Sequence, residues 1–333
     1  MNLAIIGYGY WGPNLVRNFS QIKECNVHTV ADLSDVRLSL VKQNYPYINT
    51  SRDISNVLSN ADIDAVVIAT PVFTHFELAK KALLNGKHVM IEKPMTSSEY
   101  EARELIDLSI KVGKIIMVDH TFLYTGALAK MKEIIDSNQI GKLKYFDSTR
   151  INLGLFQPDI NVLWDLAPHD ISILNYLVDY KPYSVNATGI SHTNNGIENV
   201  AYMTVNYDTD FIAHFNCSWT SPVKVRSTLI GGDKKMILYN DLEPSEKVRV
   251  YDTGFEHKTE EDRTKIMVDY RVGDVHIPHL SSREALYGVA QDFVFSILQN
   301  KSPLANAELG LNVVKILEAA QKSIKNNGKE III

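Results

Sequence analysis

Two side chains that could share one chemical task lie four residues apart in the stretch NVLWDLAPHDIS, residues 161–172. On a helix, Asp165 and His169 would stand one turn apart on the same face. An ionised aspartate and a histidine are costly on an apolar face unless something specific holds them. Either they satisfy each other as a buried structural pair, or they face a pocket in which the carboxylate orients a general base.

A second group of polar residues follows two apolar, strand-like runs. The run ending in IEKPM supplies Glu92 and Lys93, and the run before it ends in ATPVFTH, residues 69–75. In open α/β sheets, ligands bind outside the carboxyl ends of the parallel strands. Lys93 could therefore bond a substrate oxygen or relay a proton, or it could be a surface lysine before a turn-forming proline. Thr70 and Pro71 are placed to line a cofactor, whereas His75 is either a further contact or the first residue of a helix.

The third motif is GYGYWG, which follows a strand-like run and opens a helical pattern. Gly7, Gly9 and Gly12 would allow a tight turn, a close approach of the main chain to a pyrophosphate, and close packing of helix on strand. Asp32 ends the next strand-like run, about 20 residues further on, where an acid binds a ribose 2′-hydroxyl and repels a 2′-phosphate. The motif therefore predicts NAD, with NADP the less favoured cofactor; the alternative is a plain glycine turn beside a surface aspartate.

Composition limits the class of protein. The 333 residues are 45% apolar and 22% charged, with a net charge of -5 and a pI near 6.1. Such a chain forms ordinary globular domains and lacks the basic stripe of a nucleic-acid-binding protein. No apolar run reaches membrane-spanning length and the start does not resemble a signal peptide. Two cysteines make no disulfide framework. We expect a soluble cytoplasmic protein, and the scattered histidines predict no metal site.

The elements that must position these residues alternate at first and then change character. Up to about residue 120, Val- and Ile-rich strands alternate with amphipathic helices, which predicts a doubly wound parallel sheet. After that, strands follow one another from residue 183 to 251 with few helices between them, which predicts a mainly antiparallel sheet. We therefore expect an amino-terminal Rossmann domain, residues 1–120, and a second α+β domain for substrate binding and oligomerisation, residues 121–333.

Taken in order, GYGYWG, EKP and DLAPH resemble the glucose-fructose oxidoreductase / inositol dehydrogenase / MocA family, over almost the whole chain. Further stretches look like members that act on nucleotide-sugar uronates, such as 3-dehydrogenases. The resemblance implies an NAD-dependent oxidoreductase that transfers a hydride between a sugar carbon and nicotinamide. It also implies that Lys93 bonds the reacting hydroxyl, that His169 is the general base, and that Asp165 orients it or contacts the sugar. Bulky Leu163 and Trp164 stand where many members have small glycines.

The predicted site residues fall into two further sets. The predicted cofactor contacts are Gly7, Gly9, Tyr10, Trp11, Gly12, Asp32, Thr70, Pro71, His75, Glu92 and Lys93. The predicted substrate contacts are Lys93, His120, Tyr124, Arg150, Asn152, Asp165 and His169. Arg150 could bind a substrate carboxylate with both arms of its guanidinium, or pair with a structural acid.

Two other functions compete with a sugar dehydrogenase. A sensor or regulator on the same fold would bind NAD without turnover, since fold does not fix function. An NAD-dependent glycosidase would oxidise its substrate transiently and release a glycoside without accumulating NADH. Apolar residues on both faces of the second sheet, with Tyr202, Phe211 and Phe215 among them, favour a homodimer or homotetramer. The alternative is that the terminal helices cover that face.

Overall fold

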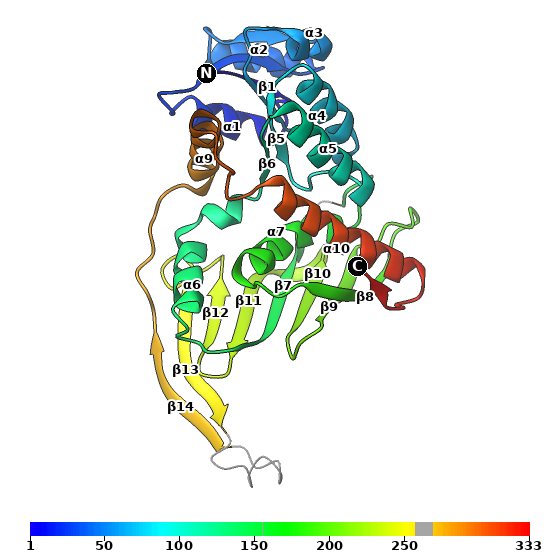
Figure 1. Cartoon of the computed structure of the whole chain (residues 1–333). Helices are drawn as coiled ribbons and strands as arrows, with labels where there is room; N and C mark the ends of the chain where they lie inside the picture. The colour runs from blue at the N-terminus through cyan, green and yellow to red at the C-terminus, as the bar shows by residue number, and fades with distance from the viewer. Residues whose placement is uncertain (155, 257–268) are drawn as a thin grey trace. The chain divides into compact units, whose positions relative to one another are not determined.

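The computed structural model describes residues 1–154, 156–256 and 269–333, which form two compact units (Figure 1). Unit 1 contains Met1–Thr125 and Arg283–Lys315, and unit 2 contains Gly126–Ser282 and Ile316–Ile333. This division differs from the predicted ranges 1–120 and 121–333, because a segment near the carboxyl terminus belongs to the first unit. The physical reason lies in its contacts. The Val118 main-chain N–H donates to the Ala305 carbonyl at 2.9 Å, and the rings of Phe19 and Phe293 pack edge-to-face at 6.3 Å.

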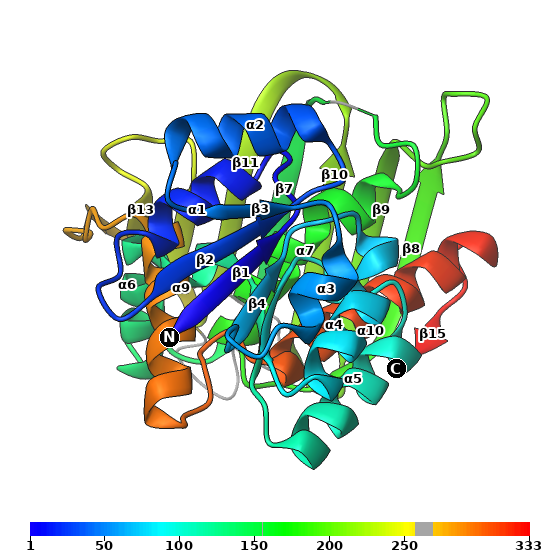
Figure 2. The ribbon, with the colours of Figure 1, turned by 90° about the horizontal axis from the view of Figure 1, so that it is seen from above.

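Unit 1 is built on a six-stranded sheet in the order β3-β2-β1-β4-β5-β6, with every neighbouring pair parallel. Figure 2 shows β3, β2, β1 and β4 in this order. The strands are β1 (Asn2–Ile6), β2 (Asn26–Ala31), β3 (Asn49–Ser51), β4 (Ala65–Ile68), β5 (His88–Glu92) and β6 (Ile116–Asp119). This order confirms the predicted doubly wound fold, in which ligands bind beyond the carboxyl ends of the strands.

Helices cover both faces of this sheet, with α1 and α9 on one side and α4 and α5 on the other (Figure 1). Continuous Val, Leu and Ile runs such as Leu3–Ile6 are buried for that reason. The helices are α1 (Gly12–Phe19), α2 (Asp35–Asn44), α3 (Ile54–Ser59), α4 (His75–Leu84), α5 (Glu99–Val112) and α9 (Ala285–Gln299), with short 3-10 turns η1 (Val72–Thr74) and η2 (Thr121–Tyr124). A further helix, α10 (Ala307–Lys325), begins in unit 1 and ends in unit 2.

Unit 2 is built on a nine-stranded sheet in the order β14-β13-β12-β11-β7-β10-β9-β8-β15. Neighbours are antiparallel except for β7 and β10, which run parallel, so the predicted mainly antiparallel sheet is confirmed. The strands are β7 (Leu143–Leu153), β8 (Pro182–Ile190), β9 (Val200–Tyr207), β10 (Ile212–Ser218), β11 (Thr220–Gly232), β12 (Met236–Asn240), β13 (Val248–Glu256), β14 (Asp269–His276) and β15 (Ile331–Ile332). The helices α6 (Gly126–Asp136) and α7 (Val162–Leu177) pack against each other, and α7 lies on β7, β9 and β10.

The faces of this second sheet differ in what covers them. Phe215 is buried completely and Phe211 is 3% exposed, whereas Tyr202 is 49% exposed. Of the three aromatics named in the sequence, only Tyr202 is thus available to an exposed apolar face. Alternate residues of a strand point to opposite faces, so Phe215 belongs to the packed face and Tyr202 to the other.

Candidate active site

The glycine motif forms a tight turn between β1 and α1. Gly7 has a φ of +99°, and a Cβ there would lie 2.4 Å from the carbonyl oxygen of Ala69. A Cβ on Gly12 would lie 2.7 Å from the carbonyl oxygen of Gly7. Only glycine fits these two positions, so the main chain can turn closely and leave the start of α1 open to an anion. Pro13 stands in the first turn of α1, where its missing N–H costs nothing.

Asp32 fixes this turn from the end of β2. Its Oδ2 accepts a hydrogen bond from the Tyr8 main-chain N–H at 2.7 Å, and its Oδ1 accepts one from the Ser34 N–H at 2.8 Å. The guanidinium of Arg37 lies 3.5 Å from Oδ2 and is half exposed. The turn, the open helix start and the acid suit the pyrophosphate and ribose of a dinucleotide. Tyr10 and Trp11 are exposed at the tip of the turn, with their rings edge-to-face at 5.4 Å.

His75 joins the ends of two strands. Its Nδ1 lies 3.0 Å from the carbonyl oxygen of Pro94, and its Nε2 lies 2.7 Å from that of Thr70. The ring is 1% exposed, and burial lowers its pKa. Of the two alternatives for His75, the start of α4 is thus the observed position. There the ring ties the loop after β4 to the loop that carries Lys93.

Around Lys93, which is half-buried, the structure brings together a group of buried titratable side chains. Glu92 and Asp119 end the neighbouring strands β5 and β6, and they face each other in register. His120 follows Asp119 and is fully buried, with no hydrogen-bond partner for either ring nitrogen among the described residues. Burial, and then the positive charge of Lys93, lower the pKa of His120 to about 3. His120 is therefore neutral at physiological pH.

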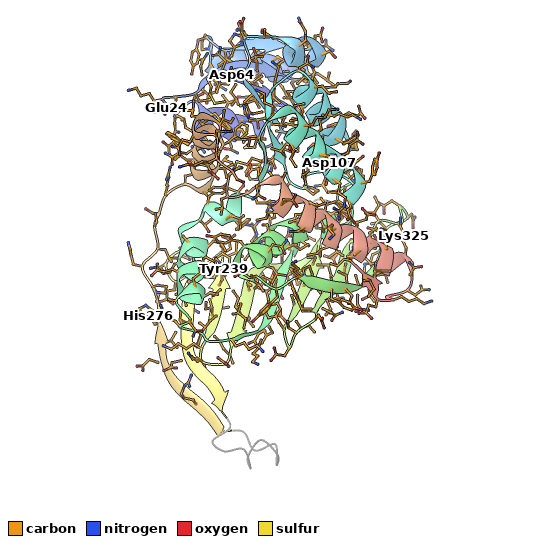
Figure 3. The ribbon with its side chains drawn as sticks, viewed as in Figure 1. Glu24, Asp64, Asp107, Tyr239, His276 and Lys325 are labelled. Carbon is orange, nitrogen blue, oxygen red and sulfur yellow. The ribbon has the colours of Figure 1, made fainter. Side chains whose placement is uncertain are left out.

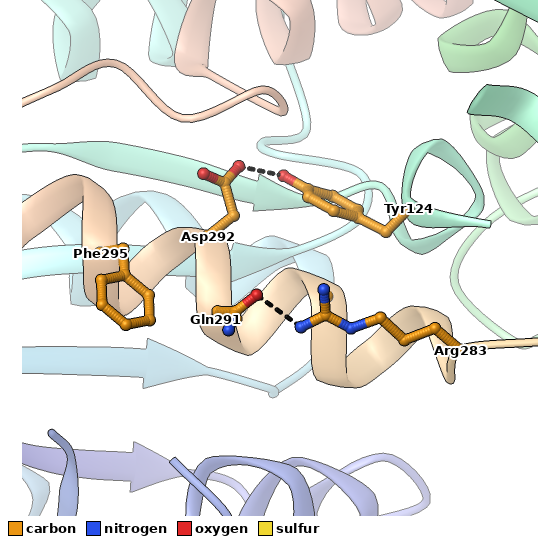
Figure 4. A pocket seen from close by; sticks show the side chains of 6 residues that line it. Tyr124, Arg283, Gln291, Asp292 and Phe295 are labelled. Carbon is orange, nitrogen blue, oxygen red and sulfur yellow. Dashed lines mark hydrogen bonds between the residues drawn. The ribbon is translucent and has the colours of Figure 1, made fainter. Parts of the chain in front are cut away.

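Tyr124 has structural partners. Its hydroxyl donates to Asp292 Oδ2 at 2.6 Å and accepts from the Ala305 N–H at 3.2 Å. Burial, and then the charge of Asp292, raise the pKa of this phenol. Tyr124 also lines a cavity of about 480 Å³ together with residues of α9 and the segment before it, as Figure 4 shows. The contacts of Tyr124 thus join the two chain segments of unit 1, Met1–Thr125 and Arg283–Lys315.

In unit 2, Asp165 and His169 lie on one face of α7 and are both half-buried, while their helix neighbours Trp164 and Ala167 are buried. Asn161 caps the start of this helix, and its Oδ1 accepts a hydrogen bond from the Trp164 N–H at 3.1 Å. Asp165 Oδ2 accepts a hydrogen bond from the indole of Trp219 at 3.0 Å. The carboxylate is thus held in one orientation while part of it stays accessible, as a residue that positions a base requires.

Arg150 takes the structural alternative that the sequence left open. Its guanidinium donates to Asp170 from Nε at 2.8 Å and from Nη2 at 2.7 Å, and both side chains are at most 5% exposed. Tyr239, labelled in Figure 3, lies nearby on β12 and donates to Asp241. The pair ties β7 to α7 directly beside His169. The guanidinium of Arg150 thus already binds a carboxylate of the protein itself. Asn152 lies two residues further along β7 and is half-buried.

Sequence reasoning missed Asp119, Asp170 and Trp219. Asp119 had a signal, because it ends an apolar run at the carboxyl edge of a parallel sheet. Asp170 and Trp219 had none, since they meet Arg150 and Asp165 only through packing of α7 on the sheet. Within the described ranges, no three His, Cys, Asp or Glu side chains group as metal ligands, and no helix is long and apolar enough to cross a bilayer.

Comparison with known proteins defines the class. Residues 1–120 match the oxidoreductase family with an NAD-binding Rossmann fold, and residues 128–238 match the GFO/IDH/MocA carboxyl-terminal domain. The chain belongs to this family of NAD-binding oxidoreductases, as the three motifs indicated.

Individual relatives share parts of the chain. A Bacillus subtilis scyllo-inositol 2-dehydrogenase (NAD(+)) is 27% identical over 250 residues, 72% of each chain. A UDP-N-acetylglucosamine 3-dehydrogenase from Acidithiobacillus ferrooxidans is 32% identical over 153 residues, 45% of this chain and 47% of that one. The crystal structure of a putative oxidoreductase from Magnetospirillum magnetotacticum has a TM-score of 0.82 at 27% identity and covers 96% of this chain and 99% of that one. The chain spans about half the length of several curated relatives that it matches.

Proposed function

We propose that this protein is an NAD-dependent sugar dehydrogenase that transfers a hydride between a hydroxyl-bearing ring carbon and nicotinamide. The observation that carries the proposal is one face of α7, where the half-buried Asp165 is held by an indole while the half-buried His169 stands one turn away. The related inositol and nucleotide-sugar dehydrogenases act on substrates rich in ring hydroxyls. A nucleotide-linked sugar or a uronate is the substrate class that we favour.

Each residue has one task in this proposal. NAD, when bound, accepts or returns the hydride at its nicotinamide ring. The Gly7–Gly12 turn and Asp32 bind the dinucleotide, and Asp32 favours a free 2′-hydroxyl over a phosphate. Lys93 bonds the reacting hydroxyl, and His169 removes its proton as the carbon loses hydride. Asp165 orients His169 or contacts the sugar.

The decisive experiment compares Lys93→Met and His169→Ala with the unchanged protein. Each variant is expected to bind NAD with unchanged affinity and to lose most turnover on a panel of sugars and nucleotide-linked uronates, followed by nicotinamide absorbance. Glu104→Gln is the matched control, because Glu104 pairs with Lys80 on the surface of unit 1. Full turnover in both variants would contradict the assignment.

The same assay separates the two competing functions. NAD binding with no turnover of any substrate would favour a sensor. Release of a glycoside without net NADH would favour a glycosidase. The grouping of Lys93 with buried acids in unit 1, and of Asp165 with His169 in unit 2, supports chemistry over sensing.

We further propose a homodimer or homotetramer that works in the cytoplasm. Tyr202, Ile212 and Leu229 are between 43% and 49% exposed on the second sheet, and they supply an apolar surface for a second copy. Cys25 and Cys217 are both free and buried, as suits a reducing compartment. Light scattering on the purified chain tests the oligomeric state, and Tyr202→Glu is expected to weaken it.

A further inference from the structure

Two carboxyl groups that no hydride-transfer step uses lie directly beside Lys93. Glu92 is 7% exposed and Asp119 is 2% exposed, and the two residues pair in register at the ends of β5 and β6. Two ionised carboxylates in one buried site repel each other, which favours a proton on one of them.

The surroundings decide which carboxyl holds that proton. Asp119 Oδ1 accepts a hydrogen bond from the Thr121 hydroxyl at 2.7 Å, which favours the ionised form. Glu92 Oε1 is buried and has no hydrogen-bond partner in the described part of the chain, so a charge there would be unsolvated. Burial, and then the neighbouring charge of Asp119, raise the pKa of Glu92 well above its usual range. These surroundings favour the proton on Glu92 and the negative charge on Asp119.

The other titratable groups around the pair are neutral, apart from Lys93. His120 is held neutral by burial and by the charge of Lys93. Burial lowers the pKa of His75, on which Lys93 also acts. Burial, and to a smaller extent the charge of Asp119, raise the pKa of the Tyr124 phenol, which therefore keeps its proton. Among these residues, Asp119 is the negative charge that faces the ammonium of Lys93.

We propose that Glu92 and Asp119 share one proton and act as a single negative charge that positions the ammonium group of Lys93. Both carboxyls ionised would place two like charges in one buried site, and both neutral would remove the negative charge that faces Lys93. One shared proton balances Lys93 and keeps its side chain directed at the strand ends. Asp119 is thus a positioning residue, and its effect on turnover rests on the proposed function of Lys93.

The first test is infrared spectroscopy of the full chain loaded with NAD at neutral pH. A carbonyl band of a protonated carboxyl group is expected, shifted in heavy water and lost in Glu92→Gln. Glu104→Gln, at the surface of the same unit, is the matched control and should keep the band. Absence of the band from the unchanged protein, or its survival in Glu92→Gln, overturns the proposal. This measurement needs no substrate, so it stands or fails apart from the proposed function.

The second test ranks two isosteric variants by turnover. Asp119→Asn removes the counter-charge, and kcat is expected to fall by about tenfold or more, the loss of one charge-assisted contact, while KM for NAD changes little. Glu92→Gln keeps the charge on Asp119, and its kcat should fall clearly less than that of Asp119→Asn. Asp119→Glu should recover part of the loss and return the pH profile toward that of the unchanged protein. Equal losses, or a larger loss in Glu92→Gln, overturn the proposal; melting curves of each variant identify any that fails to fold.

Discussion

Two buried aspartates in this protein show opposite ways of accommodating a charge. Asp170 in unit 2 receives two hydrogen bonds from the guanidinium of Arg150, which is itself buried. Asp119 in unit 1 lies in register with another buried acid, Glu92, and next to His120, whose ring nitrogens have no hydrogen-bond partner among the described residues. In a buried ion pair each charge depends on its partner, and removal of one leaves the other buried and uncompensated. The group in unit 1 leaves polar atoms unused, as sites do when their remaining partner is a ligand.

The largest expected effect on stability comes from breaking the buried ion pair of Arg150 and Asp170. Arg150→Met leaves Asp170 buried without its cation, and the free energy of unfolding should fall by about 3–5 kcal/mol. Urea denaturation measures this change. The double variant Arg150→Met with Asp170→Leu should recover most of the loss, because it removes both charges. A loss as large in the double variant as in the single one would contradict a structural pair.

The second effect is the pH dependence contributed by His120. The pKa of His120 is about 3 in the folded protein and 6.5 ordinarily, so between these values the unfolded chain binds the extra proton. The stabilisation is complete above pH 6.5 and is lost as pH falls toward 3. From pH 8 to pH 5 this residue alone should lower the free energy of unfolding by about 2 kcal/mol. The free energy of unfolding of His120→Gln should fall less steeply with pH over that range. Identical slopes for the variant and the unchanged protein would contradict a buried neutral ring.

A smaller effect is expected at His75, which links the loops after β4 and β5. His75→Phe removes the contacts with the carbonyl oxygens of Thr70 and Pro94. The neutral ring has one N–H and donates to one of these carbonyls, so its loss leaves that carbonyl without its donor and should cost about 1–3 kcal/mol of unfolding free energy. His75→Gln, whose amide can still donate to a carbonyl, is the matched variant and should lose less. Hydrogen exchange of the loop around Lys93 should rise in the Phe variant, and protection unchanged in both would refute the link.

The smallest expected effect on stability is that of replacing Asp119, which contrasts with Asp170. Asp119→Asn removes a buried charge from a site where Lys93 is only half-buried, so the free energy of unfolding should change by less than about 1 kcal/mol. Asp170→Asn, by contrast, strands Arg150 and should cost about 3 kcal/mol. Denaturation of the two variants side by side compares them directly. Similar losses would mean that both aspartates are structural.

Much of this molecule could be predicted from local patterns alone. Strand and helix periods predicted the two sheets and their types, because each pattern matches a local backbone geometry. The glycine turn was predictable from the spacing of Gly7, Gly9 and Gly12 after a strand-like run. In the structure only glycine fits position 7, where φ is +99° and Ala69 lies close by. The spacing of Asp165 and His169 placed them on one face of α7 for the same local reason.

Partners that meet through packing could not be predicted. Periodicity does not show that Arg150 pairs with Asp170, that Trp219 holds Asp165, or that the segment with Ala305 pairs with Val118. Each of these contacts joins residues far apart in the chain, and its energy depends on which surfaces the packed sheets and helices bring together. The sequence by itself determined which residues could do chemistry and on which elements they lie. Only the tertiary structure decided which of them are bound to one another, because burial turns a polar side chain into one that must have a partner.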